Sequence, residues 1–344
     1  MNEKEFKELL SSGISGGFLF FGEEPYLKRN ALAKLREQVV DEAFSVFNHI
    51  RIVGSSYSAE SLRDAIAAPP MMSEKKLIEL DELGVSDMKK SELDELCRVL
   101  EMLPRYDYNV LVLNAEDDFD AGTLPKKPSA VYKQLTEVLT PVNFERATEA
   151  QLRGWAARHF KAAGVLIGAL ECSEFVSFCG KGMDGLLCEI EKLSAYVLSH
   201  GGNAVTSEAI RQVCSRSEES DAFALVNAVL SGKSEAAFEA LADMKRRRIE
   251  PISMLGSISR VYADLISVRA LIDKGLAPYD VASRMKMHEY KAKLYCNSAR
   301  GAKAEKLKRA IALCLEADME LKSGTMSYLP IEKLVCALSS KDVI

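Results

Sequence analysis

A turn that follows the first apolar run of the chain lies where many α/β proteins hold a nucleotide. The run, residues 18–21, predicts a buried strand, and the apolar spacing after the turn predicts a helix. A phosphate-binding turn offers glycines, backbone N–H groups and a lysine followed by serine or threonine. The turn here is Gly22-Glu23-Glu24-Pro25, in which two carboxylates would repel a triphosphate and the proline lacks an N–H. We therefore expect a degenerate nucleotide loop and no bound cofactor.

Two further features bear on nucleotide chemistry. Lys28, the first lysine after the turn, is followed by Arg29 rather than by serine or threonine. Asp81 and Glu82 follow a second apolar run, residues 77–80, and resemble the acidic pair that holds magnesium in ATPases. Such a pair has nothing to act on without a phosphate cradle, and charged residues are common at strand ends. A working ATPase stays the alternative, and we expect no catalytic site in this chain.

The cysteines and histidines do not have the spacing of a metal site. Paired zinc ligands usually lie two to four residues apart on a tight turn. No two cysteines of this chain are two residues apart, and most stand on apolar stripes. The eight are Cys97, Cys172, Cys179, Cys188, Cys214, Cys296, Cys314 and Cys336. The four histidines are equally scattered. The sequence therefore predicts reduced core thiols and no metal site.

The first 145 residues alternate strand-like and helix-like patterns. Strands are predicted at residues 18–21, 49–53, 77–80, 110–113 and 142–144, with helical spacing at 26–40, 58–67, 89–103 and 129–139. Strands that alternate with helices require crossover connections, which give a mostly parallel sheet covered on both faces. The pattern predicts an α/β domain.

The remainder of the chain is predicted to be helical. Helices are expected at residues 221–231, 234–247, 251–274, 278–286, 303–322 and 331–339, and the polar run 215–220 suggests a boundary. We predict three domains: an α/β domain at 1–140, a small helical domain at 141–212 and a larger helical domain at 213–344.

Composition and charge narrow the class of protein. Hydrophobic residues make up 48% and charged residues 28% of the 344 residues, as in ordinary globular proteins, and no apolar run approaches a membrane span. The N-terminal residues lack a secretory signal, so a cytoplasmic protein is expected. Residues 1–210 carry 23 Lys and Arg against 33 Asp and Glu, whereas residues 211–344 carry 22 against 17. The basic part could face nucleic acid or be an ordinary solvated surface.

Four stretches, in order, resemble the delta subunits of the bacterial DNA polymerase III clamp loader. The first is the turn after the first strand, residues 22–27, and the second is the run 186–193 with Tyr196. The third starts at Arg248-Ile-Glu-Pro251, and the fourth is Glu316 to Gly324. They occur in order across about 300 of the 344 residues, so we identify the chain as similar to this family.

The resemblance implies a role in DNA replication without chemistry in this chain. Delta subunits have an AAA+ fold that has lost ATP binding, followed by a lid-like domain and a collar domain. They assemble with ATPase subunits and delta prime, bind and open the sliding clamp, and meet primer–template DNA through the complex. Active subunits carry a Ser-Arg-Cys arginine finger near the end of the α/β domain, and residues 140–165 do not contain one. Cys214-Ser215-Arg216 has the same residue types in another order, and it lies too far toward the C-terminus. Cofactors are not expected.

The resemblance also implies where the clamp is bound. In the family, an apolar pair between the second helix and the third strand contacts the clamp, and here Met71 and Met72 stand where many members carry Leu and Phe. Pro69 and Pro70 fix the backbone just before the pair. Methionines at the edge of a sheet also fill gaps in the core, which is the alternative interpretation.

Two other signals have functional and structural interpretations. Residues 245–248 are all basic and could contact phosphates, but cations at a helix C-terminus are also favoured by the helix dipole. Residues 277–295 suggest helix, turn and helix, which would fit a helix-turn-helix DNA-binding protein. We favour the dipole for the first and a collar element for the second.

Overall fold

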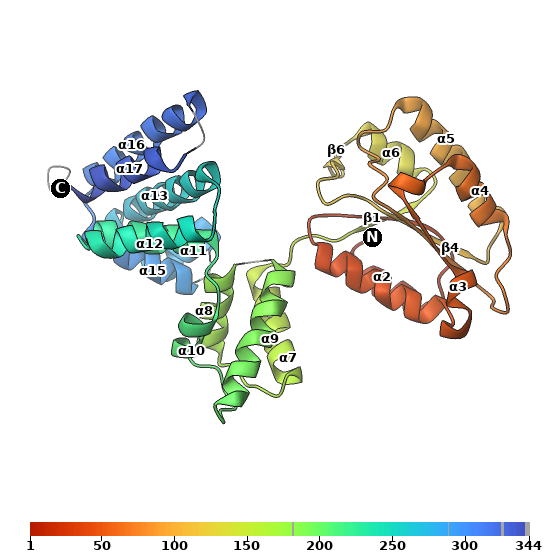
Figure 1. The fold of residues 1–344 in the computed structure, drawn as a ribbon, viewed down its shortest axis with the longest axis horizontal. Coiled ribbons are helices and arrows are strands. Elements are labelled where there is room, and N and C mark those ends of the chain that lie inside the picture. Colours follow the sequence, from red (N-terminus) through yellow and green to blue (C-terminus); the bar gives the residue numbers. More distant parts are fainter. Residues whose placement is uncertain (181, 288, 325–326, 341–344) are drawn as a thin grey trace. The chain divides into compact units, whose positions relative to one another are not determined.

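The computed structural model describes residues 1–180, 182–287, 289–324 and 327–340. The chain forms two compact units, Met1–Ala147 and Thr148–Ile344, which correspond to the red-to-yellow and yellow-green-to-blue parts of Figure 1. Among the described residues, no helix combines the length and the apolar character that a bilayer span requires.

The first unit contains a five-stranded parallel sheet. Its strands lie in the order β2-β3-β4-β1-β7. The bounds are Gly16–Phe21 for β1, His49–Val53 for β2, Lys76–Asp81 for β3, Asn109–Asn114 for β4 and Thr140–Asn143 for β7. A small antiparallel hairpin, β5 (Gly122–Thr123) and β6 (Lys127–Pro128), lies outside this sheet. All five strands fall within two residues of the segments predicted for them.

Helices cover both faces of the sheet (Figure 1). They are α1 (Glu3–Ser12), α2 (Pro25–Val39), α3 (Ser45–Asn48), α4 (Ala59–Ala67), α5 (Lys90–Leu100) and α6 (Ala130–Thr136). Alternate strand residues point to opposite faces. Phe18 and Phe20 therefore join one core with α1 and α2, while Leu19 and Phe21 join another with α4, α5 and α6. The predicted α/β domain with both faces covered is confirmed.

Helix α1 was not predicted from the sequence. Its first turn is closed by a capping box, in which the Asn2 side chain accepts from the Glu5 N–H and the Glu5 carboxylate accepts from the Asn2 N–H. Phe6 and Leu10, one helical turn apart, are buried against the sheet. The acidic and basic residues between them are its solvent face.

The regular structure described in the second unit is helical apart from one isolated bridge, Leu166 with Ala204. The helices are α7 (Glu149–Ala162), α8 (Ala169–Cys179), α9 (Met183–Ser199), α10 (Ser207–Val213), α11 (Glu218–Leu230), α12 (Ser234–Arg246), α13 (Pro251–Asp273), α14 (Pro278–Met285), α15 (Glu289–Gly301), α16 (Ala304–Ser323) and α17 (Leu329–Ser339). Helices α7–α10 pack on one another, and α11–α17 share one large core.

The three-domain division stays a prediction. The first unit runs to Ala147, so it includes strand β7, which begins at the predicted boundary of 140. The boundary after 212 falls at the end of α10, inside the second unit. The polar run 215–220 is partly helical, because Ser217 caps α11 and the helix starts at Glu218.

Candidate functional site

The residues singled out in the first unit lie at opposite edges of its sheet. The turn Gly22–Pro25 follows β1, and Asp81 ends β3, so both lie at the carboxyl edge of the parallel strands. Met71 and Met72 precede β3, so they lie at the amino edge. The carboxyl edge is where open α/β sheets bind ligands, and the two sets therefore belong to separate sites.

The degenerate loop is closed by the chain that follows β7. The Glu24 N–H donates to the Phe144 carbonyl oxygen at 3.2 Å, and the Phe144 N–H donates to Phe21 at 2.8 Å. Gly22 has a φ of +120°, and a Cβ there would lie 2.4 Å from the same Phe144 oxygen. One N–H that a phosphate would need is thus already bonded, and Pro25 has none.

Charge at the loop also disfavours a triphosphate. Glu23 pairs with Arg146 at 3.0 Å, with both side chains exposed. Lys28 is buried, and its Nζ donates to the Ala115 carbonyl at 3.0 Å and to Asp117 at 2.7 Å. A cavity of about 240 Å³ beside it is lined by Pro25, Lys28, Arg29, Glu82, Asn114, Ala115, Glu116 and Asp117. Acidic groups outnumber basic ones in this lining, and the lysine already has its partners.

The carboxylate of Asp81 is held by protein groups. It accepts from Arg51 Nε at 2.6 Å and from Asn114 Nδ2 at 3.1 Å, and it is almost fully buried. The hydrogen bond to Asp81 raises the pKa of Arg51 above its usual value. Asp81 therefore ties β3 to its neighbours β2 and β4, which is a structural use of the acidic residue at the strand end.

Met71 and Met72 do not fill the core. They lie on the loop between α4 and β3, and their exposed fractions are 48% and 79%. Met72 has a φ of +53°, a left-handed conformation that is uncommon for residues other than glycine. The interpretation that these side chains cap the sheet core is therefore not supported by their exposure.

Buried polar side chains fix the start of this loop. The last three carbonyl groups of α4 and that of the C-cap residue Ala68, residues 65–68 together, all have side-chain donors. Lys76 Nζ donates to two of them, Asn109 Nδ2 to a third at 3.0 Å and Tyr108 Oη to the fourth at 2.8 Å. Burial lowers the pKa of Lys76 to about 8. These bonds cap the helix end where its own backbone offers no partners.

Asn48 fixes the methionine pair itself. This side chain is fully buried, and its Nδ2 donates to the Met71 carbonyl at 2.8 Å and to Ser73 Oγ at 2.9 Å. Its Oδ1 accepts from the Met71 N–H at 2.7 Å. Asn48 thus satisfies both backbone groups of Met71 and holds the loop against the end of α3.

Two exposed apolar residues that the sequence analysis missed lie at the same edge. Val46 and Phe47 on α3 are 86% and 56% exposed, and only Asn48 separates them from β2. Strand β2 pairs with β3 from its first residue, since His49 pairs with Leu77 near the start of β3. The two apolar pairs therefore precede neighbouring strands, and we call Val46, Phe47, Met71 and Met72 the apolar edge patch. An apolar pair just before a predicted strand was the available signal.

The two signals in the helical unit have structural partners. Lys245 pairs with Glu332, Arg246 with Asp243 and Arg247 with Asp221. Helices α14 and α15 pack on α13 through buried Val281 and Tyr295, and residue 288 between them lies outside the described residues. Both arrangements fit ordinary helical packing.

Comparisons with known proteins agree with the predicted family. A family model described as "DNA polymerase III, delta subunit" matches residues 18–139, and one described as "DNA polymerase III delta subunit, C-terminal domain" matches residues 219–337. The chain is 22% identical over 330 residues to DNA polymerase III subunit delta of Bacillus subtilis, covering 93% of this chain and 91% of that protein. It is 23% identical over 266 residues to the probable DNA polymerase III subunit delta of Aquifex aeolicus, covering 75% and 72%.

One solved structure extends this similarity to the fold. The Bacillus subtilis DNA clamp loader delta protein matches with a TM-score of 0.50 at 20% identity, over 98% of this chain and 99% of that one. With the five-stranded parallel sheet and the helical second unit, this likeness confirms the predicted AAA+-like fold.

Proposed function

Because the chain belongs to the family of DNA polymerase III delta subunits, we propose that it acts in DNA replication as a clamp-loader subunit that binds and opens the sliding clamp. The apolar edge patch is the clamp-binding surface, with Met71 and Met72 at its centre and Pro70 directly before them. The subunit itself hydrolyses no nucleotide, and the energy for the loading cycle comes from ATPase partners.

The observation that carries this proposal is an exposed apolar pair on a rigid loop. Large exposed apolar side chains that cluster are typical of a protein-binding surface. The capped end of α4 and the Asn48 bonds restrict the loop before binding, which lowers the ordering cost that an interface otherwise incurs. The patch therefore has the features of a preorganised anchor for an apolar pocket.

The lack of ATPase activity in this proposal is supported by the carboxyl edge of the sheet. A phosphate site needs free backbone donors and a free lysine, and here the Glu24 N–H and the Lys28 ammonium already have protein partners. The interaction of the chain with nucleotide is thus expected to be through neighbouring subunits.

The proposed partners follow from the family. Besides the sliding clamp, they are the ATPase subunits and delta prime, which would join through the collar helices α11–α17, and primer–template DNA would be met through the assembled complex. The collar helices leave Leu315 and Met319 of α16 exposed at 60% and 64%. Such a complex acts on chromosomal DNA, so we place the protein in the cytoplasm.

Replacing both methionines tests the proposal. Full burial of an exposed methionine contributes about 1.5–3 kcal/mol, and scaling by the exposed fractions of Met71 and Met72 gives about 2–4 kcal/mol for the pair. Met71→Ala/Met72→Ala should therefore weaken binding to the host's sliding clamp by roughly 30-fold to 800-fold. The melting temperature should change little, because neither side chain is in the core.

A matched control uses another exposed apolar pair. Leu315→Ala/Met319→Ala removes a comparable exposed area from α16, and it should leave binding to the isolated clamp unchanged. Surface plasmon resonance with immobilised clamp measures both variants. Unchanged clamp affinity in the methionine variant would exclude the loop as the binding site.

A further inference from the structure

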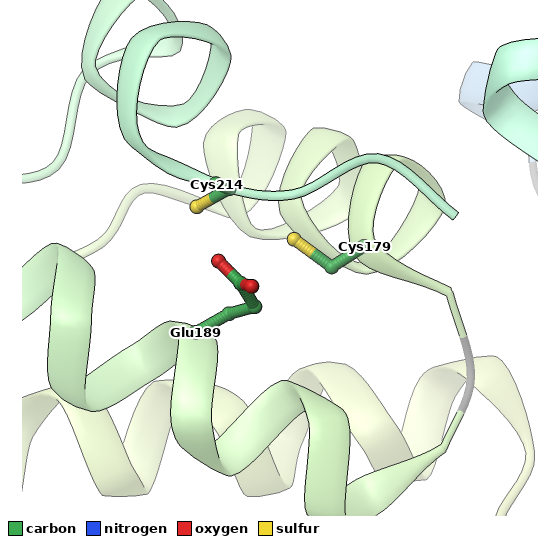
Figure 2. Close-up of side chains that lie close together, drawn as sticks. All are labelled: Cys179, Glu189 and Cys214. Carbon is green, nitrogen blue, oxygen red and sulfur yellow. The ribbon is translucent and has the colours of Figure 1, made fainter. Parts of the chain in front are cut away.

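Three side chains that are distant in the sequence meet at one end of the group formed by helices α7–α10. Cys179 is the last residue of α8, Glu189 lies on α9 and Cys214 directly follows α10. One ligand atom from each residue lies within 4.8 Å of the other two. Figure 2 shows the carboxylate of Glu189 and the sulfur atoms of both cysteines directed toward a common point.

Backbone contacts bring the three together. The Cys214 N–H donates to Ile210 at 3.0 Å and closes α10, so the chain leaves this helix in an extended conformation. The Ser217 N–H then donates to the Phe178 carbonyl at 2.9 Å, which places the connector 214–217 against the last turn of α8. Ser220 Oγ caps the neighbouring carbonyl, that of Ser177, at 2.8 Å. The cluster therefore lies where the connector to α11 crosses α8.

We propose that Cys179, Glu189 and Cys214 form a binding site for one Zn²⁺ ion, with water as the fourth ligand. Thiolate sulfur and carboxylate oxygen are ligands that zinc takes in tetrahedral sites. Zn–S bonds of about 2.3 Å and Zn–O bonds of about 2.1 Å place ligand atoms about 3.6–3.8 Å apart. The cluster already lies within 4.8 Å, so side-chain shifts of about an ångström complete the site.

The surrounding groups fit an ion at this place. Lys192 Nζ pairs with Glu189 Oε2 at 2.7 Å, and the Ser215 N–H donates to the same oxygen at 3.1 Å. Both contacts orient the carboxylate through Oε2 and leave Oε1 for the metal, as outer partners of ligating carboxylates do. Two thiolates and one carboxylate would carry three negative charges, which Zn²⁺ and the ammonium of Lys192 together neutralise.

A bound ion would add a link among three segments that already share polar contacts, such as the ion pair of Arg211 on α10 with Glu174 on α8. It would join the ends of α8 and α10 to the middle of α9 and fix the connector 214–217, which leads into α11. Because the ion binds only the folded arrangement, zinc stabilises the second unit by mass action. The inferred role of the ion is structural: it would fix the connector that leads into helices α11–α17.

The test uses the full chain, reduced and treated with a chelator. Competition with a chromophoric zinc indicator should give one site per chain, and Co²⁺ should bind with a thiolate-to-cobalt charge-transfer absorption. Cys179→Ser and Cys214→Ser should each weaken zinc binding by at least tenfold and reduce that absorption, because only one thiolate ligand remains. Glu189→Gln, which keeps the size and the hydrogen-bonding shape of the side chain, should weaken binding by about tenfold.

A neighbouring cysteine supplies the control. Cys188 is exposed and adjacent to Glu189, and Cys188→Ser should leave zinc binding and the cobalt spectrum unchanged. Zinc should raise the melting temperature of the wild type and of Cys188→Ser but not that of Cys214→Ser. The proposal is overturned if the wild type binds no zinc, if cobalt binds without the charge-transfer absorption, or if loss of Cys188 abolishes binding. A Cys179–Cys214 disulfide that persists in thiol buffer and excludes zinc would overturn it as well.

Discussion

The rigidity of the loop that carries Met71 and Met72 can be tested at Asn48, whose buried side chain would not contact the clamp. Asn48→Ala removes three hydrogen bonds, of 2.7, 2.8 and 2.9 Å, that join the buried side chain to Met71 and Ser73. Each such bond has a net value of about 1 kcal/mol. Met71 is half-exposed, so bonds to water replace part of the lost hydrogen bonding. We therefore expect that ordering the loop costs about 1.5–3 kcal/mol more when the variant binds the clamp.

This value predicts the effect on the clamp interaction. Clamp affinity of Asn48→Ala should fall by roughly tenfold to a hundredfold, although the apolar edge patch keeps all four side chains. Ser73→Ala is the matched control, because it removes only one of the three bonds and should have the smallest effect. Surface plasmon resonance gives the affinities, and circular dichroism of each variant confirms that the sheet domain is folded.

A double-mutant cycle separates loop order from direct contact. When Met71 and Met72 are already alanine, the loop has little left to contribute to binding, so adding Asn48→Ala should have a smaller effect than it has alone. We expect a coupling of at least about 0.5 kcal/mol. If a folded Asn48→Ala variant binds as tightly as the wild type, or if the two effects simply add, the loop is not preorganised by Asn48 and the argument from rigidity fails.

Three further predictions concern both edges of the sheet. Val46→Ser/Phe47→Ser should weaken clamp binding by about tenfold or more with little change in melting temperature, since both side chains are exposed; unchanged affinity would remove them from the patch. Burial lowers the pKa of Lys76 from 10.5 to about 8, so between pH 8 and pH 10.5 the unfolded chain binds more protons than the folded chain. The free energy of unfolding therefore increases as the pH rises through this range. The difference in unfolding free energy between the wild type and Lys76→Met, measured by urea titration, should therefore grow from pH 8 to pH 10.5, and a constant difference would contradict this. Calorimetry with ATP and Mg²⁺ should show no saturable heat, because the Glu24 N–H is already bonded, and micromolar binding would refute the degenerate loop.

Much of the first unit could be predicted because each signal is local. Apolar runs such as 18–21 and 110–113 are long enough to be buried on both faces, and the helical spacing between them requires parallel crossovers. The loss of a phosphate cradle is also a local property, since Glu23, Glu24 and Pro25 are consecutive. The same holds for Pro69-Pro70-Met71-Met72, whose position was identified through the family resemblance. Helix α1 was missed because its apolar positions are few and its capping box involves only Asn2 and Glu5.

The tertiary structure decided which residues meet across elements. Val46 and Phe47 precede one strand and Met71 and Met72 another, and only the pairing of β2 with β3 brings the two pairs to the same edge of the sheet. In the same way, Cys179, Glu189 and Cys214 have no metal-ligand spacing in the sequence and approach one another because three helices end or cross at one place. Sequence spacing reports neighbours within one helix or strand, where the backbone geometry is fixed. Neighbours from different elements depend on how the side chains of whole faces pack, which no short stretch of sequence specifies.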